Sequence, residues 1–232
     1  MTRAGNPPPC APRPSLARGP RLRLLHRQIL GCRRCQEAGL LDRAAPILPA
    51  PLPVRVVLVG QAPGRVEQSA GRPFSGRGGR ALFRWLAEAG LGGEEEARRS
   101  IYLTSITKCF PGPASSGSGD RRPSPAEVEL CRGHLDRQLE LLSPWLVLAV
   151  GQMAVERFLG AVPMHLTVGR LFSAVGVELE PSAVPAAAER PLVLPLPHPS
   201  GASRWLNSEA NRALLARALR TLEALLGAPL GA

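Results

Sequence analysis

The chain has 232 residues, 44% of them hydrophobic, which is the size and composition of one folded domain with a buried core. Its formal net charge of +11 predicts a polyanionic partner, with nucleic acid favoured over an anionic membrane. No apolar run approaches the roughly 18 residues of a membrane span, and the N-terminus lacks the continuous apolar segment of a secretory signal. We therefore expect a cytoplasmic protein with no membrane partner.

The first half of the chain predicts a basic arm followed by a domain that begins with a buried strand. Residues 1–20 are rich in Pro, Arg, Ala and Gly, which is typical of a disordered arm, so we place one α/β domain over residues 21–228. The mostly β-branched run 54–59 predicts a short strand that ends at Gly60. A loop rich in Gly and Pro follows, and a helical pattern then covers residues 79–89.

The second half alternates strands with helices. Further strands are predicted over 101–104, over 145–150 and in the run before His198, with a strand pair within 170–180. Helices are predicted over 124–142, 152–159 and 207–226, the first opened by a Ser124–Glu127 capping box, whereas the acidic patch 94–96 and the loop 111–123 are assigned to no helix. The alternation predicts a single three-layer α/β/α domain with a mainly parallel central sheet. Ligand-binding loops of such sheets follow the carboxyl ends of the strands.

Four cysteines are candidate metal ligands. Cys32 and Cys35 form a Cys-x-x-Cys pair, Cys109 directly follows a predicted strand, and Cys131 lies on the predicted helix beyond the long loop. Soft ligands from two distant segments suit either a structural zinc or a [4Fe–4S] cluster. A redox dithiol at Cys32 and Cys35, with the other two cysteines merely buried, is the alternative.

Two loops far apart in the sequence carry the most specific signals. The run Gly60-Gln-Ala-Pro-Gly64 resembles motif one of the uracil-DNA glycosylase superfamily, and His198-Pro-Ser-Gly-Ala-Ser203 resembles its motif two. The four cysteines, with Lys108 before Cys109, resemble the iron–sulfur branch usually called family 4. The resemblance implies a [4Fe–4S] cluster rather than zinc, and a monomeric repair enzyme that hydrolyses the N-glycosidic bond of flipped-out uracil in DNA and leaves an abasic site.

The same resemblance assigns roles to individual residues. His198 would donate a hydrogen bond beside uracil O2, and backbone amides near Gln61 and Ala62 would add donors or orient water. The predicted substrate contacts, in chain order, are Gly60, Glu67 beside the base, Phe74 as a stacking ring, and Ser105 at the uracil edge. The predicted contacts to the DNA backbone beside the flipped nucleotide are Ser200, Ser203 and Arg204.

Three positions depart from the family pattern. Ala62 stands where some members carry a water-activating Asp, Ser105 replaces an Asn that reads the uracil edge, and Ala202 replaces a bulky wedge. Because one Asn amide both donates and accepts, the Ser105 change leaves two alternatives open: a glycosylase for hypoxanthine or xanthine, and a cluster-bearing DNA-binding protein with little catalysis. Further phosphate contacts are predicted at Arg65, Arg72, Arg77, Arg80, Lys108, Arg121, Arg122 and Arg204.

Overall fold

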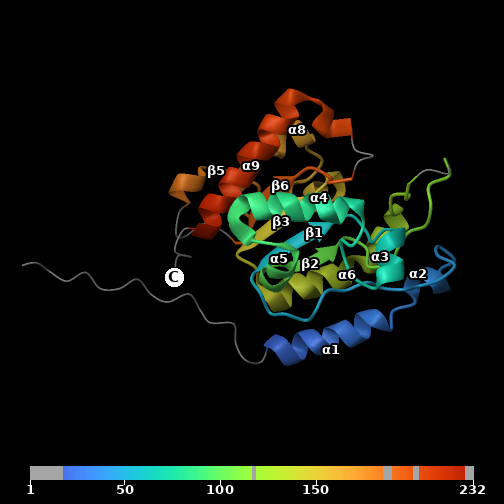
Figure 1. The fold of residues 1–232 in the computed structure, drawn as a ribbon. Helices are drawn as coiled ribbons and strands as arrows, with labels where there is room; N and C mark the ends of the chain where they lie inside the picture. The colour runs from blue at the N-terminus through green and yellow to red at the C-terminus, as the bar shows by residue number, and fades with distance from the viewer. Residues whose placement is uncertain (1–17, 117–118, 185–189, 201–203, 228–232) are drawn as a thin grey trace, which may run out of the picture.

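A mixed six-stranded sheet forms the centre of the computed structural model, which describes residues 18–116, 119–184, 190–200 and 204–227 (Figure 1). The strand order is β2-β1-β3-β6-β4-β5. The first four strands in this order pair in parallel, whereas β4 is antiparallel to both β6 and β5. The strands are β1 Val56–Gly60, β2 Tyr102–Ser105, β3 Leu146–Val150, β4 Leu171–Phe172, β5 Glu178–Leu179 and β6 Leu192–Leu196.

Helices cover both faces of the sheet. One face packs against helices α4 Arg77–Leu86, α5 Glu94–Ser100 and α9 Glu209–Gly227, through alternate strand residues such as Leu58 and Leu148. The other face packs against α1 Arg18–Leu30, α6 Pro125–Leu142 and α7 Gln152–Leu159, through the intervening residues such as Val57 and Val147. Each central strand is buried along its whole length, which explains why these strands read as continuous apolar runs.

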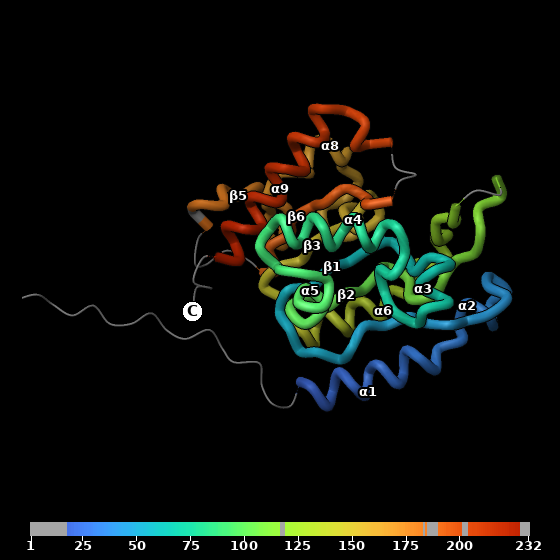
Figure 2. Tube along the Cα trace, viewed as in Figure 1, coloured from blue at the N-terminus to red at the C-terminus, as the bar shows by residue number. Residues whose placement is uncertain are grey.

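Short helical segments connect these layers. They are α2 Arg34–Glu37, α3 Arg65–Ala70, α8 Met164–Thr167, the π-helical turn η1 Ala87–Leu91, and the 3₁₀ turns η2 Pro181–Ala183 and η3 Arg204–Asn207. The tube in Figure 2 shows α1 running beneath α6, on the side of the molecule opposite α9. The first helix therefore covers the outer side of the α6 layer.

The structure confirms the predicted fold class, the four parallel strands and the strand pair within 170–180. Four α-helices were not predicted: α3 lies in the predicted loop after Gly60, α5 occupies the acidic patch, and α2 and α8 are single turns of four residues each. Helix α1 begins at Arg18, three residues inside the predicted arm, and residues 1–17 of that arm lie outside the described part of the chain. No helix in the described ranges is both long and apolar enough to cross a membrane.

Candidate active site and cysteine pocket

The loops after β1 and β2 are joined at the carboxyl edge of the sheet. Gly60 and Ser105 are paired in register as the last residues of their strands. Beyond them, Ile106 N–H donates to Gly60 O at 2.9 Å and Thr107 N–H donates to Gln61 O at 3.2 Å. The ladder therefore continues past the strand ends and fixes the backbone beside the half-buried Gln61 and Ala62.

Phe74 reaches this edge from the loop between α3 and α4, in a strained conformation. Its φ is 55°, in the left-handed region that a bulky residue seldom adopts. The ring lies over Gly60, where an added Cβ would be 2.8 Å from the ring atom Cζ, and the carbonyl oxygen lies 1.8 Å from where a Cβ of Gly79 would stand. Both glycines are required for the half-buried Phe74 ring to occupy this place.

His198 lies beyond β6, beside Gly151 at the end of β3. An added Cβ on Gly151 would be 3.1 Å from His198 Cδ2, and Gly151 has a φ of 82°. The backbone N–H of Ser200 donates to His198 Nδ1 at 3.3 Å, with Ser200 Oγ 2.9 Å from the same nitrogen. Burial lowers the pKa of His198 below its usual value. Because Nδ1 accepts from an amide, the neutral ring carries its proton on Nε2 and is a hydrogen-bond donor there.

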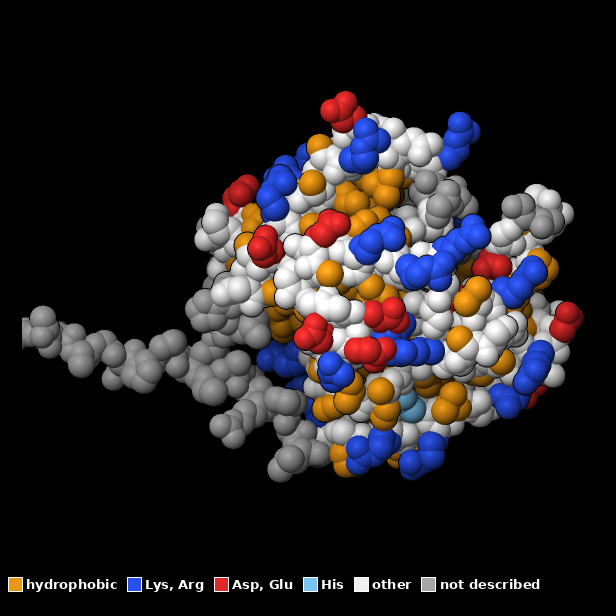
Figure 3. Space-filling model, viewed as in Figure 1, with side chains coloured by type: hydrophobic (Ala, Val, Ile, Leu, Met, Phe, Trp, Pro, Cys, Tyr) orange, Lys and Arg blue, Asp and Glu red, His pale blue; other side chains and the backbone are white. Residues whose placement is uncertain are grey.

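The N-terminus of α4 brings the two loops together. An added Cβ on Gly78 would lie 3.7 Å from Ser200 N, while the neighbouring Gly79 contacts Phe74. Two consecutive glycines thus place the stacking candidate and the His198 loop at one helix end. In Figure 3 basic side chains gather over this helix, whose exposed arginines are Arg77, Arg80 and Arg84.

Ser105 and Lys108 belong to a buried network of polar groups. Ser105 is 7% exposed and its hydroxyl donates to Thr107 O at 2.7 Å. Lys108 is 1% exposed, and its Nζ donates to Ser105 O and, at 2.9 Å, to Thr104 Oγ1. The predicted phosphate contact at Lys108 is therefore wrong, because its charged end is enclosed by the loop that it supports.

The network continues from Thr104 to the first helix. Thr104 Oγ1 donates to Gln138 Oε1 at 3.1 Å, Gln138 Nε2 donates to Tyr102 Oη at 2.6 Å, and Tyr102 Oη is 2.7 Å from His26 Nε2. The direction of the bond between Tyr102 and His26 depends on the tautomer of the His26 ring. Burial, with a smaller effect of the Lys108 charge, lowers the pKa of His26 to about 4.

The carboxylates nearest the Gly60 loop are already engaged by the backbone. Glu67 accepts from Gly64 N–H at 3.0 Å and from Gly76 N–H at 2.8 Å, so it ties the two ends of the loop that carries Phe74. Asp120, from the long loop, accepts from Arg65 N–H at 3.3 Å. Sequence reasoning gave Asp120 no role, because this contact joins residues that are far apart in the chain.

The other predicted DNA contacts are distributed unevenly. Arg204 is exposed on η3, and Ser203 lies outside the described residues, as does Ala202. Arg121 forms a two-pronged ion pair with the buried Glu127, with distances of 2.7 and 2.8 Å. Arg72 pairs with Glu95 at 2.6 Å. Those two arginines are thus held by acids of this chain.

All four predicted cysteine ligands line one pocket, together with Thr107 and His134. Burial and the neighbouring thiols raise the pKa of Cys35 to about 11 and that of Cys109 to about 12. Within the described residues no group of three or more His, Cys, Asp or Glu side chains is arranged to hold a metal ion.

This pocket also contains unpaired polar atoms. Among the described residues, the buried side-chain polar atoms without a hydrogen-bond partner are Thr107 Oγ1 and His134 Nε2, and both residues line the cysteine pocket. Buried polar groups in folded proteins are rarely left unpaired, so two in one place call for an acceptor that the protein itself does not supply.

Comparison with known proteins identifies the family. Residues 49–223 match the model of the uracil DNA glycosylase superfamily. The chain is 33% identical over 141 residues to the type-4 uracil-DNA glycosylase of Archaeoglobus fulgidus and 33% identical over 116 residues to that of Thermotoga maritima. These matches cover 61% and 50% of this chain, and 65% and 55% of the relatives.

A type-5 enzyme is also similar over a longer stretch. The type-5 uracil-DNA glycosylase of Pyrobaculum aerophilum is 30% identical over 183 residues, which cover 73% of this chain and 77% of that protein. The family match includes β1, the Phe74 loop and the His198 loop, and extends over most of the described domain. The chain belongs to the uracil DNA glycosylase superfamily.

Proposed function

We propose that this protein is a monomeric, cytoplasmic DNA repair glycosylase that removes uracil flipped out of DNA and leaves an abasic site. The observation that carries the proposal is the grouping of the Gly60 loop, the Phe74 ring and a neutral His198 around the N-terminus of α4. The relatives named type-4 and type-5 uracil-DNA glycosylase support the choice of uracil. Exposed arginines on α4 provide charge for the DNA backbone.

Bond cleavage in this site would depend on the departing base. When the bond between uracil N1 and the sugar C1′ breaks, its electron pair goes to uracil, and water adds to C1′ with loss of a proton. His198 Nε2–H would donate to uracil O2 as negative charge develops there. Because Glu67 and Asp120 already accept backbone amides, stabilisation of the leaving group would contribute more than activation of water by a carboxylate.

Recognition of the uracil edge would depend on backbone groups more than on Ser105. The Ser105 hydroxyl proton is committed to Thr107 O, which leaves only lone pairs for a ligand. A backbone carbonyl and amide beside Gln61 and Ala62 can replace the paired donor and acceptor of an Asn amide. Phe74 would stack on the flat base, at about 1–3 kcal/mol.

The cysteine pocket fits a [4Fe–4S] cluster held by Cys32, Cys35, Cys109 and Cys131. In a cluster the four thiolates bind different irons, so they need not converge on one point as zinc ligands do. The unpaired Thr107 hydroxyl and His134 Nε2 would find acceptors in the cluster sulfurs. When bound, the cluster would lower the thiol pKa values by its positive iron and join α2, the Cys109 loop and α6.

The test is excision from oligonucleotides that carry one uracil, hypoxanthine or xanthine, in single and double strands. Abasic sites are revealed by alkaline cleavage, with His198→Ala as the control. We expect uracil release that disappears in the control. Release of only hypoxanthine or xanthine would favour the alternative of a glycosylase for another deaminated base. No release from any substrate, by protein with its visible cluster absorbance intact, would contradict the enzyme and favour a DNA-binding relative.

A further inference from the structure

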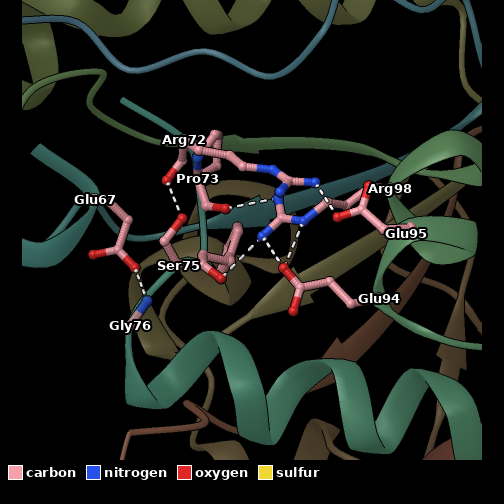
Figure 4. Close-up of polar contacts among 9 residues, drawn as sticks. Glu67, Arg72, Pro73, Ser75, Gly76, Glu94, Glu95 and Arg98 are labelled. Carbon is pink, nitrogen blue, oxygen red and sulfur yellow. Dashed lines mark hydrogen bonds and ion pairs between the residues drawn. The ribbon is translucent and has the colours of Figure 1, made fainter. Parts of the chain in front are cut away.

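We propose that Arg98 is a positioning residue for base recognition: it holds the backbone of Phe74 so that the ring stays over Gly60. Figure 4 shows the Arg98 side chain reaching from α5 to the loop that carries Arg72, Pro73 and Ser75. This inference rests on the proposed function, because it assigns Phe74 to the uracil ring. It adds a residue outside both sequence motifs to the site.

The guanidinium of Arg98 is aimed at the backbone of this loop. Nη1 donates to Pro73 O at 2.9 Å and Nη2 donates to Phe74 O at 3.2 Å. The Arg98 side chain is 8% exposed, so these bonds are shielded from water. A planar group with fixed donors suits two neighbouring carbonyls, whereas a lysine ammonium would lack that geometry.

Two further contacts orient the guanidinium. Arg98 pairs with Glu94 one turn earlier on α5, at 2.8 Å, and lies over the ring of Phe83 of α4 at 4.5 Å from the ring centre. Phe83 is a buried residue of the core. Arg98 therefore connects two helices of one layer to the loop, and its direction does not depend on Phe74.

The Phe74 conformation needs such support. Its left-handed φ is unfavourable for a bulky residue, and such strain persists only where the surroundings impose it. Gly60 and Gly79 leave room for the ring and the carbonyl but do not pull on them. The two hydrogen bonds from Arg98 act on the carbonyl groups on either side of the Phe74 Cα, so they oppose rotation of this residue away from Gly60.

The experiment is a double-mutant cycle between Arg98→Gln and Phe74→Ala, with uracil excision as the readout. Arg99→Gln is the matched control, because Arg99 is the next residue on α5 and is exposed. We expect Arg98→Gln to lower kcat/KM by about 10- to 100-fold when Phe74 is present. In the Phe74→Ala background the same change should cost less than about threefold. Arg98→Lys should recover only part of the lost activity. The control variant Arg99→Gln should retain wild-type activity.

A merely structural role would give a different result. If Arg98 only stabilised α5, Arg98→Gln would cost the same factor in both backgrounds, and that additivity would overturn the proposal. Thermal melting of every variant identifies losses that come from unfolding.

Amide hydrogen exchange separates this inference from the proposed activity. Residues 72–79 should exchange faster in Arg98→Gln than in Arg99→Gln, whether or not uracil is released. Unchanged exchange at residues 72–79 would refute the proposal that Arg98 holds the Phe74 backbone. A wild-type protein that excises no base would refute the proposed function. Faster exchange in Arg98→Gln would then still support the role of Arg98 in holding the Phe74 backbone.

Discussion

The cysteine pocket and the candidate active site at the carboxyl edge of the sheet differ in how many of their polar groups find hydrogen-bond partners within the chain. At the carboxyl edge, Glu67, Ser105, His198 and Arg98 each have a partner within the chain. The cysteine pocket instead contains two buried polar atoms without partners in the described residues, and thiols whose pKa values are raised by burial and by one another. The first region is arranged before any ligand arrives, whereas the second keeps two polar atoms unpaired among the described residues, as expected if the proposed cluster occupies it.

The largest effect should come from removing the donor at the preorganised edge. His198→Ala is expected to lower the excision rate by about 10²–10³-fold, because one hydrogen bond to the developing anion is lost. Affinity for DNA, measured by fluorescence anisotropy, should change little. Ser200→Ala is the control, since the Ser200 amide still holds the ring, and it should cost far less. A His198→Ala protein with near-normal turnover would show that this edge is not the active site.

The pocket should respond to loss of a ligand by losing stability. Cys131→Ser is expected to abolish bound iron and visible absorbance and to lower the Tm by at least about 5 °C, because metal binding contributes directly to folding. Cys10→Ser changes a thiol outside the predicted ligand set and should alter neither. If the purified protein contains zinc and no iron, the zinc site is the correct alternative to the cluster. If it contains neither metal, the prediction of a metal site is wrong.

Filling the space beside Phe74 should disturb the edge alone. Gly79→Ala would place a methyl group 1.8 Å from Phe74 O, so we expect a loss of about 1–3 kcal/mol in the free energy of unfolding together with weaker excision. Gly133→Ala is the matched control on α6, where nothing lies within 4 Å of an added Cβ. It should stabilise the helix by about 0.5–1 kcal/mol. Equal Tm values for the two variants would contradict the close contact.

The smallest effect concerns the polar network that runs from Lys108 to His26. The folded pKa of His26 is about 4, below its ordinary 6.5, so the unfolded chain binds more protons between these values. The stability from neutral His26 is complete above about pH 6.5 and falls as the pH drops toward 4.

The measurement is the Tm of wild type and His26→Gln from pH 7.5 to 4.5. Gln can still form a hydrogen bond with Tyr102 but does not titrate. Between pH 7 and 5 the Tm of wild type should therefore fall by about 2–4 °C more than that of His26→Gln. This corresponds to about 1 kcal/mol in the free energy of unfolding after solvent screening. Parallel curves for the two proteins would show that His26 does not bind a proton in this range.

The fold was predictable wherever local pattern and burial agree. Runs such as 54–59 are apolar because both faces of their strands are covered, and the Ser124–Glu127 capping box forms as expected, with Ser124 N–H donating to Glu127 at 2.7 Å. Helix α5 was missed although a signal was present: Glu94–Glu96 fill its first turn and Arg98–Arg99 its last, as the helix dipole favours. Helix α3 is short and begins after Gly64, which gives a weaker signal.

The site was predictable only in part, because sequence does not reveal burial or partners across the fold. A lysine beside a motif looks like a phosphate contact, but Lys108 is enclosed. The role of Arg98 depends on carbonyl groups that any residue would carry, so no side-chain pattern indicates it. Gln61, Ala62 and Phe74 lie at one edge of the sheet, and their roles stay predictions that excision assays can test.

The arrangement of the cysteine pocket also sets a timetable for synthesis. Cys32 and Cys35 are made early, but Cys131 follows roughly 100 residues later. At ribosomal speeds this interval lasts about 5–20 s, during which the first two thiols lack their final neighbours. The proposed cluster, bound by all four sulfurs, could therefore enter only after α6 has been synthesised, and it would join the first segment to the domain at that late stage.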